Sequence, residues 1–175
     1  MATIKARKGF GQLELNQVAF RRDGRVEAQM PFKADEGKTY ENGMIVIVDK
    51  ENGVLKTGTI TDDTPLYGIL YTSEELYDSR KPGLKNFGMT VVDGKVVGPE
   101  GYDVCGRVGY LAVGDRFTTN TFAGTDFEKG KKVAPNAKGE WAVVEAVTAG
   151  PVGVVAEVYT MPDGQDAIKI AIVKA

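Results

Sequence analysis

The sequence predicts a mostly β protein, and three observations support that prediction. Short runs rich in Val, Ile, Thr and Tyr recur along the 175 residues. Glycines fall between these runs, and the 22 glycines supply the turns that short strands need. Only one segment has a helical pattern. We therefore expect a small β-barrel or β-sandwich, in which short strands bury one face.

The clearest predicted strands are apolar runs at the two ends of the expected β domain and a hairpin between them. Residues 44–48 read Met-Ile-Val-Ile-Val, and residues 167–173 alternate isoleucine with smaller or polar residues. Residues 93–94 are Asp-Gly, flanked by the runs 90–92 and 95–97. This dipeptide predicts a two-residue hairpin, because both central positions of a type I′ turn need positive φ.

The one predicted helix is short. Thr72 and Glu75 have the spacing of a capping box, and Pro82 ends the pattern, so residues 72–80 are expected to form about two turns. A helix of that length is a connector and not a structural layer.

A weak internal repeat divides the expected β domain, residues 35–175. Two units, about residues 37–71 and 124–160, share an aromatic-Glu-x-Gly turn, two strands around a second glycine turn, and a proline before an apolar strand. Residues 72–105 form an insertion between the units. Chance alignment in a glycine-rich chain is the competing interpretation. The matching pairs are Tyr40 with Phe127, Gly43 with Gly130, Gly53 with Gly139, and Pro65 with Pro151.

The first 34 residues differ from the rest in charge and in pattern. Residues 1–33 carry a net charge of +4, whereas the remainder carries −6 of the total of −2. Apolar and polar residues alternate without a compact hairpin signal, so we expect an extended N-terminal arm that adds to the sheet edge of a partner. The arm residues predicted to bind that partner are Arg7, Lys8, Phe10, Leu13, Leu15, Phe20, Arg21 and Arg22.

Several residue combinations that enzymes use are missing. The chain has no histidine and a single cysteine, Cys105, which excludes histidine-based triads, imidazole zinc sites and four-cysteine zinc sites. Neither the P-loop nor the dinucleotide-binding glycine pattern is present. Adjacent carboxylates such as Asp62-Asp63 would allow a carboxylate hydrolase, but we interpret them as solvated loops. We expect no enzyme activity, catalytic residue, cofactor or metal.

Membranes and nucleic acids are not expected partners. No apolar run approaches the length that spans a bilayer, and the first residues lack the apolar core of a signal peptide. Few aromatic residues lie among the basic residues of the arm, unlike the stacking modules that bind single-stranded nucleic acid. We expect synthesis in the cytoplasm and an acidic protein surface as the partner of the arm.

Two stretches resemble the bacteriophage head decoration proteins, also called capsid cement proteins. One runs through Gly43–Asp49, Asn52–Leu55 and Thr61–Leu70, and the other covers Gly11–Gln29. The resemblance implies a small β-barrel that binds the outer surface of a phage head and stabilises it by bridging major capsid protein subunits. It also implies a homo-oligomer, often a trimer, located on the virion surface.

A second class of function stays open at this point. Another virion module of a tail or fibre, or a host- or glycan-binding domain, would display Tyr67, Tyr71 and Trp141 in an exposed shallow site. Trp141 also fits a core position of the second unit, and Cys105 fits a small buried residue.

Overall fold

The computed structural model of the chain describes residues 11–33, 39–71, 91–92, 95–96, 105–146, 149–162 and 164–175. These residues form β-strands and connecting turns, with no helix among them, which confirms the predicted mostly β class. The predicted helix over residues 72–80 lies outside the described residues.

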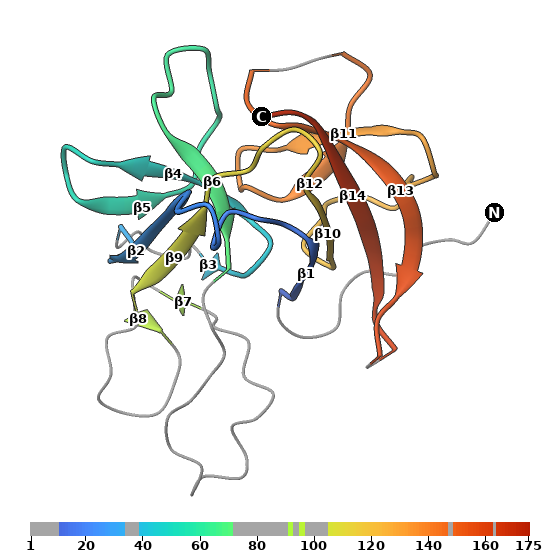
Figure 1. Cartoon of the computed structure of the whole chain (residues 1–175), viewed down its shortest axis with the longest axis horizontal. Coiled ribbons are helices and arrows are strands. Elements are labelled where there is room, and N and C mark those ends of the chain that lie inside the picture. Colours follow the sequence, from blue (N-terminus) through green and yellow to red (C-terminus); the bar gives the residue numbers. More distant parts are fainter. Residues whose placement is uncertain are drawn as a thin grey trace, which may run out of the picture.

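The strands form two larger sheets and one small sheet, all paired antiparallel (Figure 1). Sheet A contains, in spatial order, β1 (Leu13–Gln17), β10 (Arg116–Thr119), β14 (Asp166–Lys174), β13 (Val152–Thr160), β11 (Lys132–Pro135) and β12 (Trp141–Val143). Sheet B contains β2 (Val26–Met30), β9 (Gly106–Gly109), β6 (Tyr67–Leu70), β4 (Ile45–Asp49) and β5 (Val54–Lys56). Sheet C contains β3 (Thr39–Tyr40), β7 (Val91–Val92) and β8 (Lys95–Val96).

The two outer strands of sheet B are linked to each other by the residues that follow β2. Phe32 forms a parallel bridge with Leu55 of β5. The amide of Leu55 donates to the carbonyl oxygen of Pro31, and the amide of Lys33 donates to that of Leu55, both at 2.8 Å. The Phe32 ring also packs on Tyr40, with centroids 4.7 Å apart. The sheet therefore curves back on itself.

Sheet A makes a comparable link, but from its second strand, β10, because β1 is the outer strand on that side. Phe122, which follows β10, forms a parallel bridge with Trp141 of β12. The amide of Ala123 donates to the carbonyl oxygen of Trp141 at 2.9 Å, and the amide of Trp141 donates to that of Thr121 at 3.2 Å. The Phe122 ring packs on Phe127 at 4.9 Å, as Phe32 packs on Tyr40.

The same glycine turn precedes β4 in sheet B and β11 in sheet A. The amide of Gly43 donates to the carbonyl oxygen of Leu70 at 2.9 Å, and the amide of Gly130 donates to that of Val155 at 2.8 Å. Both glycines have positive φ, 90° and 92°, which an L side chain rarely adopts. The contacts of β4 with β6 are thus matched by those of β11 with β13.

The second glycine turn is equally shared. The side chain of Asp49 accepts a hydrogen bond from the amide of Asn52 at 3.0 Å, and that of Asn136 accepts one from the amide of Lys138 at 2.8 Å. Such turns let a short polar side chain replace a backbone acceptor. In both segments, the repeat units predicted from the sequence have the same order of turns and the same strand pairing.

The predicted insertion, residues 72–105, is described at only a few positions. Val92 of β7 pairs with Lys95 of β8, as expected for strands joined by the two residues at 93–94. Val91 pairs with Tyr40 of β3, so β3 and these two strands together form sheet C. Cys105 is half-buried.

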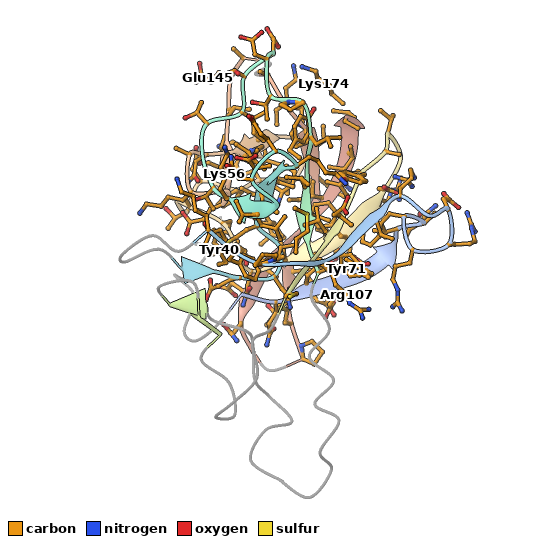
Figure 2. The ribbon with its side chains drawn as sticks, turned by 90° about the vertical axis from the view of Figure 1, so that its left-hand side faces the viewer. Tyr40, Lys56, Tyr71, Arg107, Glu145 and Lys174 are labelled. Atoms are coloured by element: carbon orange, nitrogen blue, oxygen red, sulfur yellow. The ribbon has the colours of Figure 1, made fainter. Side chains whose placement is uncertain are left out.

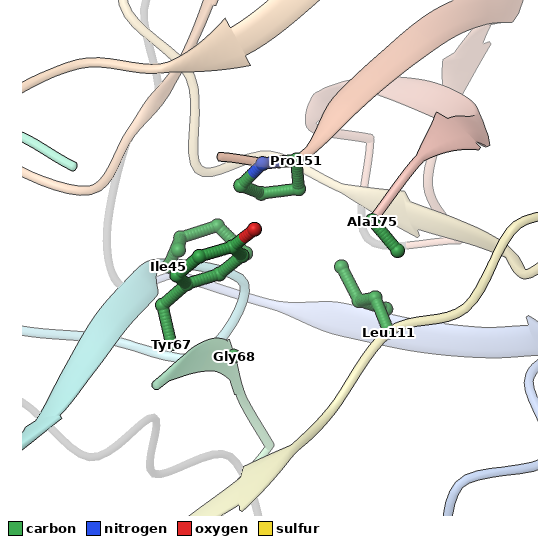
Figure 3. Close-up of a pocket in the computed structure, with 6 residues that line it drawn as sticks. All are labelled: Ile45, Tyr67, Gly68, Leu111, Pro151 and Ala175. Carbon is green, nitrogen blue, oxygen red and sulfur yellow. The ribbon is translucent and has the colours of Figure 1, made fainter. Parts of the chain in front are cut away.

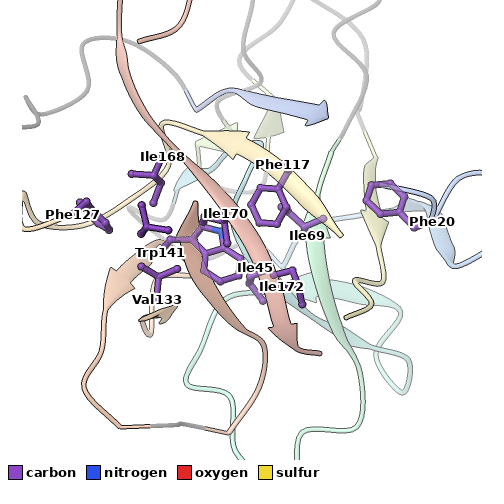
Figure 4. Close-up of a cluster of buried hydrophobic side chains, with 11 residues drawn as sticks. Phe20, Ile45, Ile69, Phe117, Phe127, Val133, Trp141, Ile168, Ile170 and Ile172 are labelled. Carbon is purple, nitrogen blue, oxygen red and sulfur yellow. The ribbon is translucent and has the colours of Figure 1, made fainter. Parts of the chain in front are cut away.

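Two apolar clusters fill the interior. The smaller lies inside sheet B and is built around Tyr40, Leu55 and Val108. The larger joins the inner face of sheet A to the opposite face of sheet B (Figure 4). Its buried members are Phe20, Ile45, Ile69, Phe117, Phe127, Val133, Trp141, Val155, Ile168, Ile170 and Ile172. Sheet B is therefore covered on both faces, whereas sheet A has one outer face.

The N-terminal segment predicted as an arm contributes to both larger sheets. β1 pairs with β10 of sheet A, and β2 pairs with β9 of sheet B. Within residues 11–33, β1 and β2 are therefore part of the β body and not of a free arm. Residues 1–10 lie outside the described residues, and for them the extended arm stays a prediction.

Candidate partner-binding arm and its anchor

The predicted arm residues are distributed between the body and its surface. Leu13 packs at the edge of the larger cluster, and Leu15 is 37% exposed. Phe20 is fully buried, whereas Arg21 and Arg22 are exposed on the turn that follows it. Arg7, Lys8 and Phe10 lie outside the described residues. Leu15, Arg21 and Arg22 are thus the described side chains of this set that a partner can reach.

Phe20 fixes the segment between β1 and β2 to the body. A Cβ placed on Gly109 would approach the Phe20 ring to 2.6 Å, so only glycine lets the ring lie on β9. The ring of Tyr71 packs on that of Phe20, with the two centroids 4.7 Å apart. Tyr71 also donates its amide hydrogen to the carbonyl oxygen of Arg107 at 2.9 Å, and the two lie near each other in Figure 2.

The start of the described chain is held by a buried polar run, residues 118–121, which we call the anchor; it covers the last two residues of β10 and the two that follow. Its side chains are at most 1% exposed. The amide of Gln12 donates to the side chain of Asn120 at 2.6 Å, and the Thr119 hydroxyl donates to the carbonyl oxygen of Gln12 at 2.7 Å. Thr118 donates to the side chain of Asn16 at 2.6 Å. Buried polar groups require such partners.

The anchor also contacts the glycine turn of sheet B. The Thr121 hydroxyl donates to the carbonyl oxygen of Asn42 at 2.7 Å. Gly11 fits where a Cβ would come within 2.7 Å of Glu41 and 2.8 Å of the Asn42 carbonyl oxygen. Gly11 therefore lies at a seam between the two sheets, in contact with residues of both.

Charged groups next to the arm are paired. Arg25 lies 3.5 Å from the carboxylate of Asp115, which is 8% exposed, and also donates to the carbonyl oxygen of Tyr110. The hydrogen bond from Lys50 holds the pKa of Glu27 below its usual range, although burial opposes this. Burial, together with the neighbouring Glu27, raises the pKa of Tyr110 to about 12.

One hollow among the described residues is too small for a small-molecule ligand. The hollow lined by Ile45, Tyr67, Leu111 and Pro151 has a volume of about 20 Å³, room for about one water molecule (Figure 3). Ligand pockets are at least about ten times larger. No group of three or more acidic or cysteine side chains in the described part is placed to hold a metal ion. Nor does this part include a membrane-spanning helix.

Other sequence-predicted positions have clear locations. Trp141 is fully buried, and Tyr67 and Tyr71 are half-buried, so these three do not form an exposed aromatic platform. Asp62 and Asp63 are exposed in a turn. The sequence did not predict the anchor because a polar run resembles a loop. Its signal is four consecutive hydroxyl or amide side chains, residues 118–121, which run from the end of a strand into the following turn.

Comparisons with known proteins give no further guide to the site. No protein family, no curated protein and no solved structure matches this chain.

Proposed function

We propose that this chain is a structural virion protein that binds the outer surface of a phage capsid and stabilises it by bridging major capsid protein subunits. The observation that carries the proposal is the position of Gly11, held between the anchor of sheet A and the turn at Glu41 and Asn42 of sheet B. A pull on the basic segment before Gly11 is thereby passed to both sheets. A protein that holds capsid subunits together needs its contact segment to be anchored in this way, so that force is carried by the whole fold.

The architecture is consistent with that role. We propose that each larger sheet is a small barrel, because the bridge Phe32 to Leu55 joins the end of β2 to β5 and the bridge Phe122 to Trp141 joins the end of β10 to β12. Two related barrels in tandem bury their edges and need no catalytic group. Trimeric association above the major capsid protein is part of the proposal, on the resemblance of residues 11–29 and 43–70 to decoration proteins.

The experiment is co-sedimentation with expanded, undecorated heads. The full chain is expected to pellet with the heads. The double substitution Arg7→Glu with Lys8→Glu should weaken this binding by roughly tenfold or more, since it reverses two charges on the arm. The matched control, Lys129→Glu with Lys138→Glu, changes the same charge on an exposed part of the body. No pelleting of the unmodified chain rejects the proposal.

A further inference from the structure

We propose that the outer face of sheet A is a second docking surface, and that its partner is an acidic protein surface with an apolar centre. The surface is centred on the outer row, four residues aligned across neighbouring strands: Lys132, Val154, Ala171 and Arg116. This inference rests on the proposed function, because the capsid surface is the partner that it assigns.

The outer row is defined by strand register. Lys132 of β11 pairs with Val154 of β13, Val154 pairs with Ala171 of β14, and Ala171 pairs with Arg116 of β10. Directly paired residues in antiparallel strands point to the same face. The next residue on β11, Val133, is fully buried in the larger cluster, so the row faces the other way, to solvent.

Sheet B shows what this row does in the same fold. Its equivalent row is Ile45, Ile69, Gly109 and Val26, paired in the same order. Ile45 is 2% exposed and Ile69 is fully buried, because this row packs into the cluster shared with sheet A. Sheet B therefore packs against sheet A through this row. The contact is head-to-tail, and it leaves the matching row of sheet A without a counterpart among the described residues.

The charge and polarity of the outer row indicate the chemistry of its partner. Lys132 and Arg116, at the two ends, are exposed, and neither has an ion pair within the described residues. Val154 and Ala171 between them are half-buried. Three strand spacings separate the two cations by about 14 Å. A ridge of small apolar residues flanked by carboxylates is complementary to this row.

Neighbouring residues extend the apolar part and reduce the local negative charge. Val173 is 50% exposed on the same side of β14. Val113, 68% exposed, lies beside the end of that strand, where the amide of Gly114 donates to the carbonyl oxygen of Ile172 at 2.9 Å. Glu157, on the same face, is paired with Lys169 at 2.9 Å. Exposed apolar groups gathered in this way mark interaction sites.

The test compares two lysines of one hairpin. Lys132 and Lys138 are both exposed, and Lys132→Glu and Lys138→Glu make the same charge change. Binding to expanded heads is titrated for both, for Lys132→Glu combined with Arg116→Glu, and for the unmodified chain, with circular dichroism to show that each folds. We expect a loss of about tenfold for Lys132→Glu, a larger loss for the double variant, and none for Lys138→Glu.

Three outcomes overturn the inference and differ from one another. Equal binding of the Lys132 and Lys138 variants removes the row from the interface while leaving the proposed function intact. Failure of the unmodified chain to bind heads rejects the proposed function, and the row's assigned partner with it. If the double variant binds heads normally but dissociates an oligomer in light scattering, the row joins copies of this chain instead.

Discussion

The indole N–H of Trp141 donates a hydrogen bond to the carbonyl oxygen of Gly43, 3.0 Å away. Trp141 belongs to sheet A, and Gly43 begins the turn before β4 of sheet B. The bond is fully buried, and beside it the amide of Ile45 donates to the carbonyl oxygen of Gly139 at 2.8 Å. The two sheets are thus joined by directional bonds as well as by the shared apolar cluster.

Replacing Trp141 with Phe should therefore destabilise the whole chain and not sheet A alone. The substitution removes buried ring volume and leaves the Gly43 carbonyl oxygen without this donor, so we expect a loss of about 2–4 kcal/mol in the free energy of unfolding. Urea denaturation followed by circular dichroism measures it. Tyr67→Phe, which removes one hydroxyl from a half-buried ring, should cost far less. Two separate transitions in the Trp141 variant would show that the sheets unfold independently.

Gly53 and Gly139 occupy the same place in the two sheets but have different neighbours. Both have positive φ, 65° and 83°, so alanine is strained at either position, by about 1 kcal/mol. An added Cβ on Gly53 meets nothing within 4 Å, whereas on Gly139 it collides with the backbone of Ile45. Gly139→Ala should lower the melting temperature clearly more than Gly53→Ala. Equal effects would contradict the close contact between the sheets.

Paired carboxylates make the protein sensitive to acid. Lys50 lowers the pKa of Glu27, and the hydrogen bond from Lys56 lowers that of Asp49. A carboxyl whose pKa is lower in the folded state adds stability above its unfolded-state pKa of about 4, and that stability is lost as pH falls through the folded-state value. The urea concentration at the midpoint of unfolding should therefore decrease as the pH is lowered below about 5. Glu27→Gln should flatten this dependence, and Asp62→Asn, at an exposed turn, should not.

The anchor predicts a local effect on the N-terminal segment. Thr119→Val keeps the side-chain shape but removes the hydroxyl that donates to Gln12 and accepts from the amide of Thr121 at 3.0 Å. We expect a loss of about 1–3 kcal/mol and faster proteolytic cleavage before β1. Mass spectrometry of limited digests locates the cut. Thr160→Val, at an exposed strand end, is the control; unchanged cleavage in the Thr119 variant would show that the anchor does not hold the segment.

Local sequence signals predicted the turns and the strands well. Glycines at positions 43, 53, 130 and 139 have the positive φ values that their turn contexts indicated. The alternating isoleucines of residues 167–173 lie in β14, with Ile168, Ile170 and Ile172 buried on one face. These turns and strands depend on residues close together in the chain, so local sequence patterns are sufficient to predict them.

Long-range pairing was beyond such signals. β1 pairs with β10, about a hundred residues later, and the alternation in β1 does not identify that partner. Phe20 was predicted to face a partner, but the glycine at position 109 creates space for its ring inside the body. The anchor is polar and buried, a combination that composition alone does not reveal, because its hydrogen-bond partners lie in or next to β1 and in the turn before β4, far away in the sequence.

Cryo-electron microscopy of expanded phage heads incubated with this protein tests its proposed capsid role. We expect added density on the outer surface that spans neighbouring major capsid protein subunits, with the chain before Gly11 continuing into a contact with them. Heads without added density at saturating protein, or density confined to a tail, would contradict it.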